Sequence, residues 1–183
     1  LLEAGIELAR SGGPQAVVLR EATRRAGVAP NAAYRHFANR DALLQAVRAA
    51  AVSAVAVAME AELAKVSKRL KPAAQARARV RAVGTGYLRF AQNETGLFRV
   101  AFGIPFGVDP EPDPAKGGLT GLNPFQHLGA ALDQLVAAGA LPKERRPLAE
   151  FFAWSAVHGM AFLIIDGPLK GAPAAQLEAL GQR

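Results

Sequence analysis

Apolar residues recur at helical spacing along most of the chain. In nearly every segment, apolar side chains stand three or four positions apart, which places them on one face of an α-helix. Alanine, the residue that favours helix most, is abundant, and apolar residues do not alternate with polar ones as they do in strands. The pattern therefore predicts an all-α protein.

Start and stop signals divide this pattern into separate helices. A first helix is expected over 1–11, ended by Ser11-Gly12-Gly13-Pro14, and a second over 19–26, ended by Gly27. A third covers 30–36 and starts with Pro30, whose missing N–H costs nothing in a first turn. The later helices are expected for about six turns after the capping residue Asn39, from Pro72, over 95–102, from about Phe125, over 148–165 and over 173–182.

Three of the later segments have further features. In the helix from Pro72, Val80, Val83, Tyr87 and Leu88 face inward, and Arg77, Arg79 and Arg81 spread around the other sides. Residues 103–124 hold five glycines and five prolines, which predicts a loop, and loops this long are usually functional lids or disordered. Helix 148–165 is apolar nearly all round, so we expect it to be buried on both sides. A membrane span is the rival interpretation, but the apolar run is too short and contains His158.

Composition excludes several classes of protein. With 51% hydrophobic residues, the 183-residue chain is not disordered as a whole, and without cysteine it has no disulfide, no catalytic thiol and no thiolate metal site. Its three histidines lie far apart in the sequence, and neither a GxSxG nor a phosphate-loop pattern occurs. We therefore expect no catalytic constellation, no metal, no cofactor and no enzymatic activity.

The net charge of +7 is unevenly distributed. Residues 1–48 hold seven basic and four acidic side chains, residues 49–93 hold eight and two, and residues 94–144 hold three and six. A basic N-terminal half suggests a polyanionic partner for that half. Surface arginine on an alanine-rich protein would account for the same charge, so charge alone leaves both interpretations open.

Residues 18–44 carry the most informative motif. Two short helices flank Gly27, which can take the positive φ that ends the first of them, as a helix-turn-helix unit requires. Helix 30–36 would then be the recognition helix, whose N-terminal side chains enter the major groove. Asn31 is the best candidate for a specific base contact, with adenine as its favoured partner.

This stretch resembles the DNA-binding domain of the tetracycline-repressor (TetR) family of transcriptional regulators. The residues that carry the resemblance are Leu19-Arg20-Glu21, Ala26-Gly27-Val28, Tyr34-Arg35-His36-Phe37 and Arg40-Asp41-Ala42-Leu43-Leu44. Ala22, Thr23 and Ala29 depart from the family's pattern, and Ala29 weakens the start of the recognition helix by roughly 1 kcal/mol relative to a serine cap. The resemblance implies an N-terminal three-helix helix-turn-helix domain over 1–46 and a C-terminal helical bundle for ligand binding and dimerisation over 47–183.

The resemblance also implies which residues meet DNA. Tyr34, His36 and Arg40 would hold phosphates, and a phosphate would relieve the conflict between the Arg40 cation and the positive end of its helix. Tyr34 could instead be mainly a core ring with its hydroxyl at the surface. The full set of expected DNA-binding residues is Arg20, Pro30, Asn31, Ala32, Tyr34, Arg35, His36 and Arg40.

The second half of the chain resembles a C-terminal domain type of the same family with a Trp–His–Gly signature, here Trp154, His158 and Gly159. The expected ligand pocket is lined by Tyr87, Phe98, Phe102, Phe125, Trp154 and His158, although most of these rings could be ordinary core. The expected dimer interface contains Phe151, Ser155, Gly159 and Phe162. Ser155 and Gly159 are small and one turn apart, so another helix can approach there, either from a second copy or from the same subunit.

These inferences combine into one functional prediction. We expect a cytoplasmic, homodimeric repressor that binds a palindromic operator in double-stranded DNA and leaves it when a small, largely apolar effector binds. The resemblance implies that the helix from Pro72 packs beside the DNA-binding domain and transmits the signal, and no membrane partner is expected. Two other classes stay open: an architectural DNA binder without a ligand, and a helical small-molecule carrier or enzyme.

Overall fold

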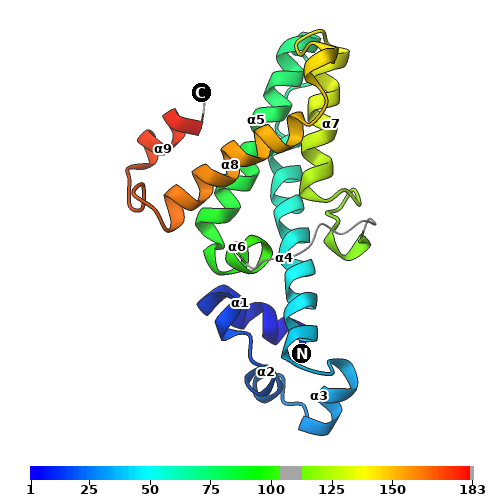
Figure 1. The fold of residues 1–183 in the computed structure, drawn as a ribbon, viewed down its shortest axis with the longest axis vertical. Helices are drawn as coiled ribbons and strands as arrows, with labels where there is room; N and C mark the ends of the chain where they lie inside the picture. The colour runs from blue at the N-terminus through cyan, green and yellow to red at the C-terminus, as the bar shows by residue number, and fades with distance from the viewer. Residues whose placement is uncertain (104–112, 182–183) are drawn as a thin grey trace.

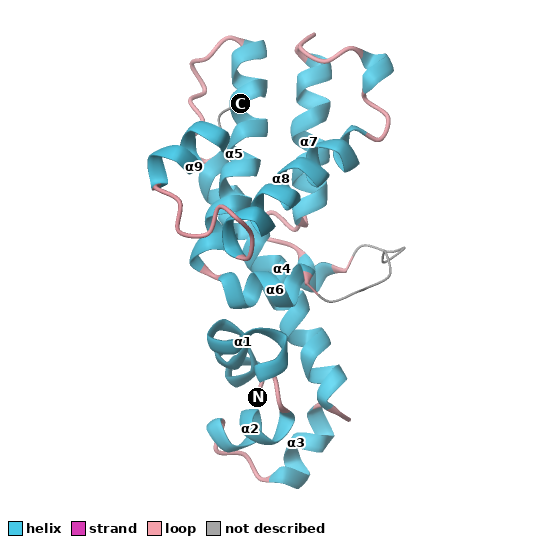
Figure 2. Cartoon of the chain, turned by 60° about the vertical axis from the view of Figure 1, so that its left-hand side comes forward, coloured by secondary structure: helices cyan, strands magenta, loops and turns pink. Residues whose placement is uncertain are grey.

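The computed structural model describes residues 1–103 and 113–181, and every regular element in these ranges is helical (Figure 1; Figure 2). The first three helices are α1 (Leu2–Ala16), α2 (Leu19–Arg25) and α3 (Pro30–His36). They are followed by α4 (Arg40–Leu63), α5 (Pro72–Asn93), α6 (Thr95–Phe102), η1 (Pro114–Lys116), α7 (Pro124–Ala137), η2 (Lys143–Arg145), α8 (Ala149–Ile165) and α9 (Ala174–Gly181). The predicted all-α class is confirmed.

Local sequence signals set the bounds of the first helices. Gly27 has a φ of 64°, in the left-handed region that glycine adopts without steric cost, and it follows the end of α2. Asn39 caps α4, because its side chain accepts a 2.9 Å hydrogen bond from the backbone N–H of Ala42. The first helix is interrupted at Gly13, where it is predicted to end, because a φ of 67° is not helical, and the rest of α1, from Pro14 to Ala16, lies beyond this kink.

Helix α4 is the central helix and runs from the helix-turn-helix end into the rest of the molecule (Figure 1). Its buried face extends from Leu43 to Met59 and packs against α1, α5, α6 and α7. Gly86 of α5 allows a close approach, because a Cβ there would lie 2.6 Å from Cα of Met59. Among the described helices, α4 alone is long and apolar enough to cross a membrane, and half of its most apolar window is buried inside the protein. The protein core therefore accounts for its apolar face.

Helix α8 differs from the sequence expectation. Its inner side packs on α5 and α7 and buries Ala161 and Ile165. Its other side is open: Leu148, just before the helix, is 72% exposed, Phe151 is 59% exposed and Phe152 is 84% exposed. The prediction that both sides are buried is therefore wrong for a single subunit, because the described helices of this chain cover only one of them.

A buried carboxylate holds the segment before α7 against α4. Residues 104–112, which belong to the predicted loop, lie outside the described residues. After this gap, the backbone N–H groups of Leu119 and Thr120 donate to the carboxylate of Glu60 on α4, at 2.8 Å and 2.9 Å. Nε2 of His127 lies 3.1 Å from the same carboxylate. Burial raises the pKa of Glu60, but the hydrogen bonds from Thr120, Leu119 and His127 outweigh burial and lower it below its ordinary value. This charged group therefore fixes the end of the predicted loop on the core.

The basic surplus of residues 49–93 lies mostly away from the helix-turn-helix end. The end of α4 and the start of α5 stand at the opposite end of the molecule from α3 (Figure 1). The basic residues of this stretch from Lys65 to Arg81 are therefore not part of a surface around α3. The expectation of a polyanionic partner near α3 therefore concerns residues 1–48 and not this second stretch.

Candidate DNA interface and ligand cavity

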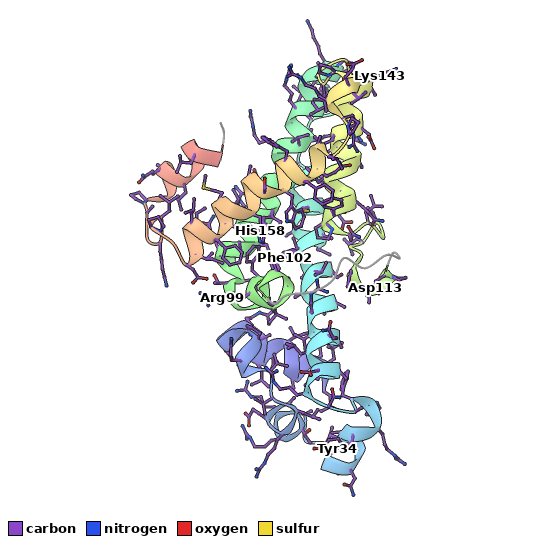
Figure 3. All side chains as sticks on the ribbon, in the orientation of Figure 1. Tyr34, Arg99, Phe102, Asp113, Lys143 and His158 are labelled. Atoms are coloured by element: carbon purple, nitrogen blue, oxygen red, sulfur yellow. The ribbon has the colours of Figure 1, made fainter. Side chains whose placement is uncertain are left out.

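Helix α3 presents polar side chains to solvent at one end of the molecule. The exposed members of the expected contact set on this helix are Asn31, Tyr34, Arg35 and His36. Tyr34 is 61% exposed and lines an open pocket with Val18 and Val28, so it is not a buried core ring (Figure 3). Ala33 is buried and anchors the helix, Ala32 is partly buried, and Pro30 is the first helical residue. The helix is therefore held from one side and free to meet a partner on the other.

Arg40 is engaged with the protein itself. Its Nε donates to the carbonyl oxygen of Val17 at 2.9 Å, and its Nη2 donates to that of Pro14 at 2.7 Å. These bonds join the first turn of α4 to the last turn of α1 and to the residue that follows it. Arg40 therefore stabilises the arrangement of the first four helices, and its contact with a phosphate stays a prediction.

Ion pairs on α2 neutralise part of the neighbouring basic surface. Glu21 pairs with Arg24 at 2.8 Å and with Arg25 at 2.9 Å. The hydrogen bonds from Arg24 and Arg25 lower the pKa of Glu21 to about 2, so this carboxylate is charged at neutral pH. Arg20 is exposed and stands outside this cluster. It is therefore a better candidate for a DNA contact than Arg24 or Arg25.

A cavity of about 500 Å³ lies between α5 and α8, and its size is typical of small-molecule sites. Of the six residues expected to form a ligand pocket, Tyr87 and Trp154 line it. Apolar side chains dominate the rest of the lining, and they include Met59, Val80, Val83, Leu128, Leu135, Val157 and Met160. The cavity therefore suits a ligand with a large apolar part.

The other expected pocket residues pack around Tyr87 and Trp154. The ring centroid of Tyr87 lies 5.2 Å from that of Phe98 and 5.4 Å from that of Phe102. His158 lies among the same rings, between α8 and α6 (Figure 3). Phe125 of α7 contacts Trp154 and Phe151, which both belong to α8. The structure thus brings the six residues together as one aromatic cluster, of which two members reach the cavity.

A hydrogen bond joins two of the helices that line the cavity. The Tyr87 hydroxyl of α5 lies 2.6 Å from Nδ1 of His158 of α8. Burial raises the pKa of the Tyr87 hydroxyl, and burial lowers the pKa of His158. Both shifts favour the neutral forms, so the bond joins a protonated phenol to a neutral imidazole.

Two charged residues of the cavity were missed by sequence reasoning. Arg77 and Arg81 line it together with Gly84, although we expected all the arginines of this helix on its other sides. Positions 77, 81, 84 and 88 fall on one helical face, so the spacing contained the signal. Sequence reasoning places charged side chains in solvent, because one helix alone does not show that a cavity lies opposite it.

Two family descriptions match the chain. Residues 1–47 match "Bacterial regulatory proteins, tetR family", and residues 80–183 match "Tetracyclin repressor-like, C-terminal domain". The chain belongs to the TetR family. It is therefore a DNA-binding transcriptional regulator and not an enzyme, and the predicted helix-turn-helix unit is confirmed. Neither description names a Trp–His–Gly type, which stays a prediction.

The fold of this TetR-family regulator also resembles that of a solved structure. A protein with unknown function from Rhodococcus sp. RHA1 superposes with a TM-score of 0.73 and 23% sequence identity, over 99% of this chain and 91% of that chain. At this identity the likeness supports the fold alone. A search of curated proteins gave no match.

In this TetR-family regulator, α6 lies between the aromatic cluster and the first helix. Gly96 of α6 packs directly on the backbone of Ala9 and Arg10, where a Cβ would not fit, and Arg10 pairs with Glu94 at 2.8 Å. At its other side, α6 contributes Phe98 and Phe102 to the cluster. Helix α1 thus packs against α6, whereas α5, which we expected beside the DNA-binding domain, packs mainly on α4, α7 and α8.

A second contact of α6 reaches the end of α8. Arg99 of α6 pairs with Asp166, which directly follows α8. The hydrogen bond from Arg99 lowers the pKa of Asp166 below its ordinary value, so the pair is charged at neutral pH. Helix α6 is therefore connected to α8 by both an ion pair and ring contacts.

Proposed function

We propose that this regulator is a cytoplasmic, homodimeric repressor that binds a palindromic operator and is released by a small, largely apolar ligand. The observation that carries the proposal is the position of α6, whose side chains contact α8 beside the cavity and whose backbone packs on α1 in the DNA-binding domain. A ligand that changes how α8 packs on the aromatic cluster also changes the position of α6. Such a ligand lowers operator affinity if it binds better to the rearranged protein.

The open face of α8 supports the dimer. Leu148, Phe152, Ser155, Gly159 and Leu163 recur every three or four residues, and all are exposed in one subunit. Nothing lies within 4 Å of a Cβ built on Gly159, so a neighbouring helix of the same subunit does not occupy this position. A contiguous apolar stripe of this kind marks an interface in soluble proteins. We propose that a second copy covers it, with Phe151 at its side and Phe162, which packs on His158, at its inner edge.

The proposed dimer sets the distance between the two helix-turn-helix units on DNA. A twofold axis through α8 would present two copies of α3 to successive major grooves of a palindromic site. In each copy, Asn31 would read a base edge together with Pro30 and Ala32. The proposed phosphate contacts come from Arg20, Tyr34, Arg35, His36 and Arg40.

The experiment is selection of bound sequences from random duplex DNA at two salt concentrations, together with light scattering to measure the mass in solution. We expect a palindromic sequence, a mass of two chains and an affinity that falls steeply with salt. The Phe152→Glu variant places a charge on the open face of α8 and should yield a monomer with at least tenfold weaker operator binding. Gln92→Glu adds the same charge at an exposed position of α5 and is the matched control.

Other outcomes would contradict parts of the proposal. Salt-dependent binding without an enriched sequence favours an architectural DNA binder. A Phe152→Glu variant that stays dimeric removes α8 from the interface. Reporter transcription that rises with the protein, instead of falling, excludes repression.

A further inference from the structure

The cavity between α5 and α8 has a charged end and an apolar end. Arg77 and Arg81 lie one turn apart at one end of the lining, and the fully buried Tyr87 lies further along the same helix. Arg77 and Tyr87 are ten positions apart, which corresponds to about 15 Å along α5. Val80 and Gly84 lie between them, and Gly84 leaves room because it has no side chain. The cavity is therefore amphipathic along its length.

The charge at this end has one sign. Two arginines and no aspartate or glutamate occur among the described lining residues. The surrounding sequence strengthens the imbalance, because residues 63–93 contain eight basic residues and no acidic one. Glu62 pairs with Lys65 and Arg89, but within the described part of the chain no ion pair involves Arg77 or Arg81. These two guanidinium groups are available to an anionic ligand.

We propose that the cavity takes an amphipathic anion, with its carboxylate or phosphate at Arg77 and Arg81 and its apolar part directed toward Tyr87. Guanidinium groups bind carboxylate and phosphate oxygens with two parallel hydrogen bonds, and their long stems can pack on the apolar part of the ligand. The apolar end of the cavity, with Met59, Leu128 and Trp154, suits a hydrocarbon chain or an aromatic ring. The inference rests on the proposed function, since it names the chemical class of the effector.

The direct test compares ligands that share one chain and differ only in the head group. Binding of decanoate, decyl phosphate, decanol and decylammonium to the full chain is measured by calorimetry, below the concentrations at which each forms micelles. We expect the better of the two anions to bind at least tenfold more tightly than decanol, and decylammonium to bind less tightly than decanol. The ratio between decanoate and decyl phosphate then shows which anion the site prefers.

Substitutions locate the head group. In the double variant Arg77→Gln and Arg81→Gln, anion affinity should fall at least tenfold while decanol affinity stays within twofold. The matched control is Arg79→Gln, because Arg79 lies on the same helix between the two arginines but lines a different cavity. Retained decanol binding shows that the double variant is folded and that its cavity is intact.

Failure of this inference can be told apart from failure of the proposed function. Three results would overturn the inference: equal affinity for anion and alcohol, no binding of any of the four probes, or an equal loss of anion affinity in the Arg79→Gln variant. Release of a labelled operator is measured in parallel with the same probes. If decanol releases the operator as well as decanoate does, the repressor proposal stands and the anion inference fails. If decanoate binds through Arg77 and Arg81 without releasing the operator, the inference about the site stands and ligand release fails.

Discussion

The Tyr87 hydroxyl is hydrogen-bonded to Nδ1 of His158 across a distance of 2.6 Å, and this bond links α5 to α8 beside the cavity. Both rings also pack on Phe98 and Phe102, which belong to α6. The two residues therefore lie where the cavity, α8 and α6 meet. A ligand that displaces either ring acts on all three elements.

The Tyr87→Phe substitution tests this bond. It removes the hydroxyl but keeps the ring, whose centroid lies 5.2 Å from that of Trp154, so Nδ1 of His158 loses its hydrogen-bond partner. The free energy of unfolding should fall by about 1 kcal/mol, which urea denaturation measures. Tyr34→Phe removes the same hydroxyl from an exposed ring and should leave the free energy of unfolding unchanged. Equal losses in the two variants would contradict the assignment.

Stability should depend on pH through His158. Burial lowers the pKa of His158 in the folded protein, so the unfolded chain, with an ordinary histidine pKa of about 6.5, takes up a proton first as the pH falls. The contribution of His158 is therefore fully present above about pH 6.5 and is lost as the pH falls through the lowered pKa of the folded state. Urea midpoints measured between about pH 5 and pH 8 should show this decline, and His158→Gln should flatten it. A decline of the same size in the variant would assign it to other groups.

Two glycines of α5 should respond oppositely to alanine. A Cβ on Gly86 would lie 2.6 Å from Cα of Met59 and 2.7 Å from the carbonyl oxygen of Ala58, so Gly86→Ala must separate α4 from α5. We expect a loss of about 1–3 kcal/mol in the free energy of unfolding. At Gly84 the nearest atom is 3.9 Å away, so Gly84→Ala should gain up to about 1 kcal/mol through helix propensity. Thermal and urea unfolding of the two variants check both signs, and a stable Gly86→Ala protein would show that the helix contact is not tight.

Two arginines of the helix-turn-helix unit should separate stability from DNA binding. Arg40→Ala removes the hydrogen bonds to Val17 and Pro14, so it should lower the free energy of unfolding by about 1 kcal/mol even without DNA. Arg35→Ala alters an exposed side chain of α3 and should leave stability unchanged while it weakens operator binding and reduces the salt dependence. Unfolding and operator titrations of both variants distinguish the two roles. An Arg40→Ala protein of wild-type stability would place Arg40 with the DNA contacts alone.

Much of the fold, including the helix-turn-helix unit, could be predicted because the signals are local. A positive φ at Gly27, a side-chain cap at Asn39 and the start of α5 at Pro72 depend on residues within one or two turns. The exposed polar face of α3 follows from its own helical spacing. The aromatic residues of the cavity region could be named, but the sequence did not show that Phe98 packs in the cluster while Trp154 reaches the cavity.

The sequence by itself determined the all-α class, most helix bounds and the helix-turn-helix motif, because propensity, capping and turn chemistry act over a few neighbouring residues. Only the tertiary structure decided which apolar faces are covered by another helix and which charged side chains line a cavity. One side of α8 is exposed, Arg77 and Arg81 line the cavity, and α1 packs on α6 at Gly96. These outcomes depend on packing between segments that are distant in the sequence, and the spacing within one helix carries no information on what lies opposite it.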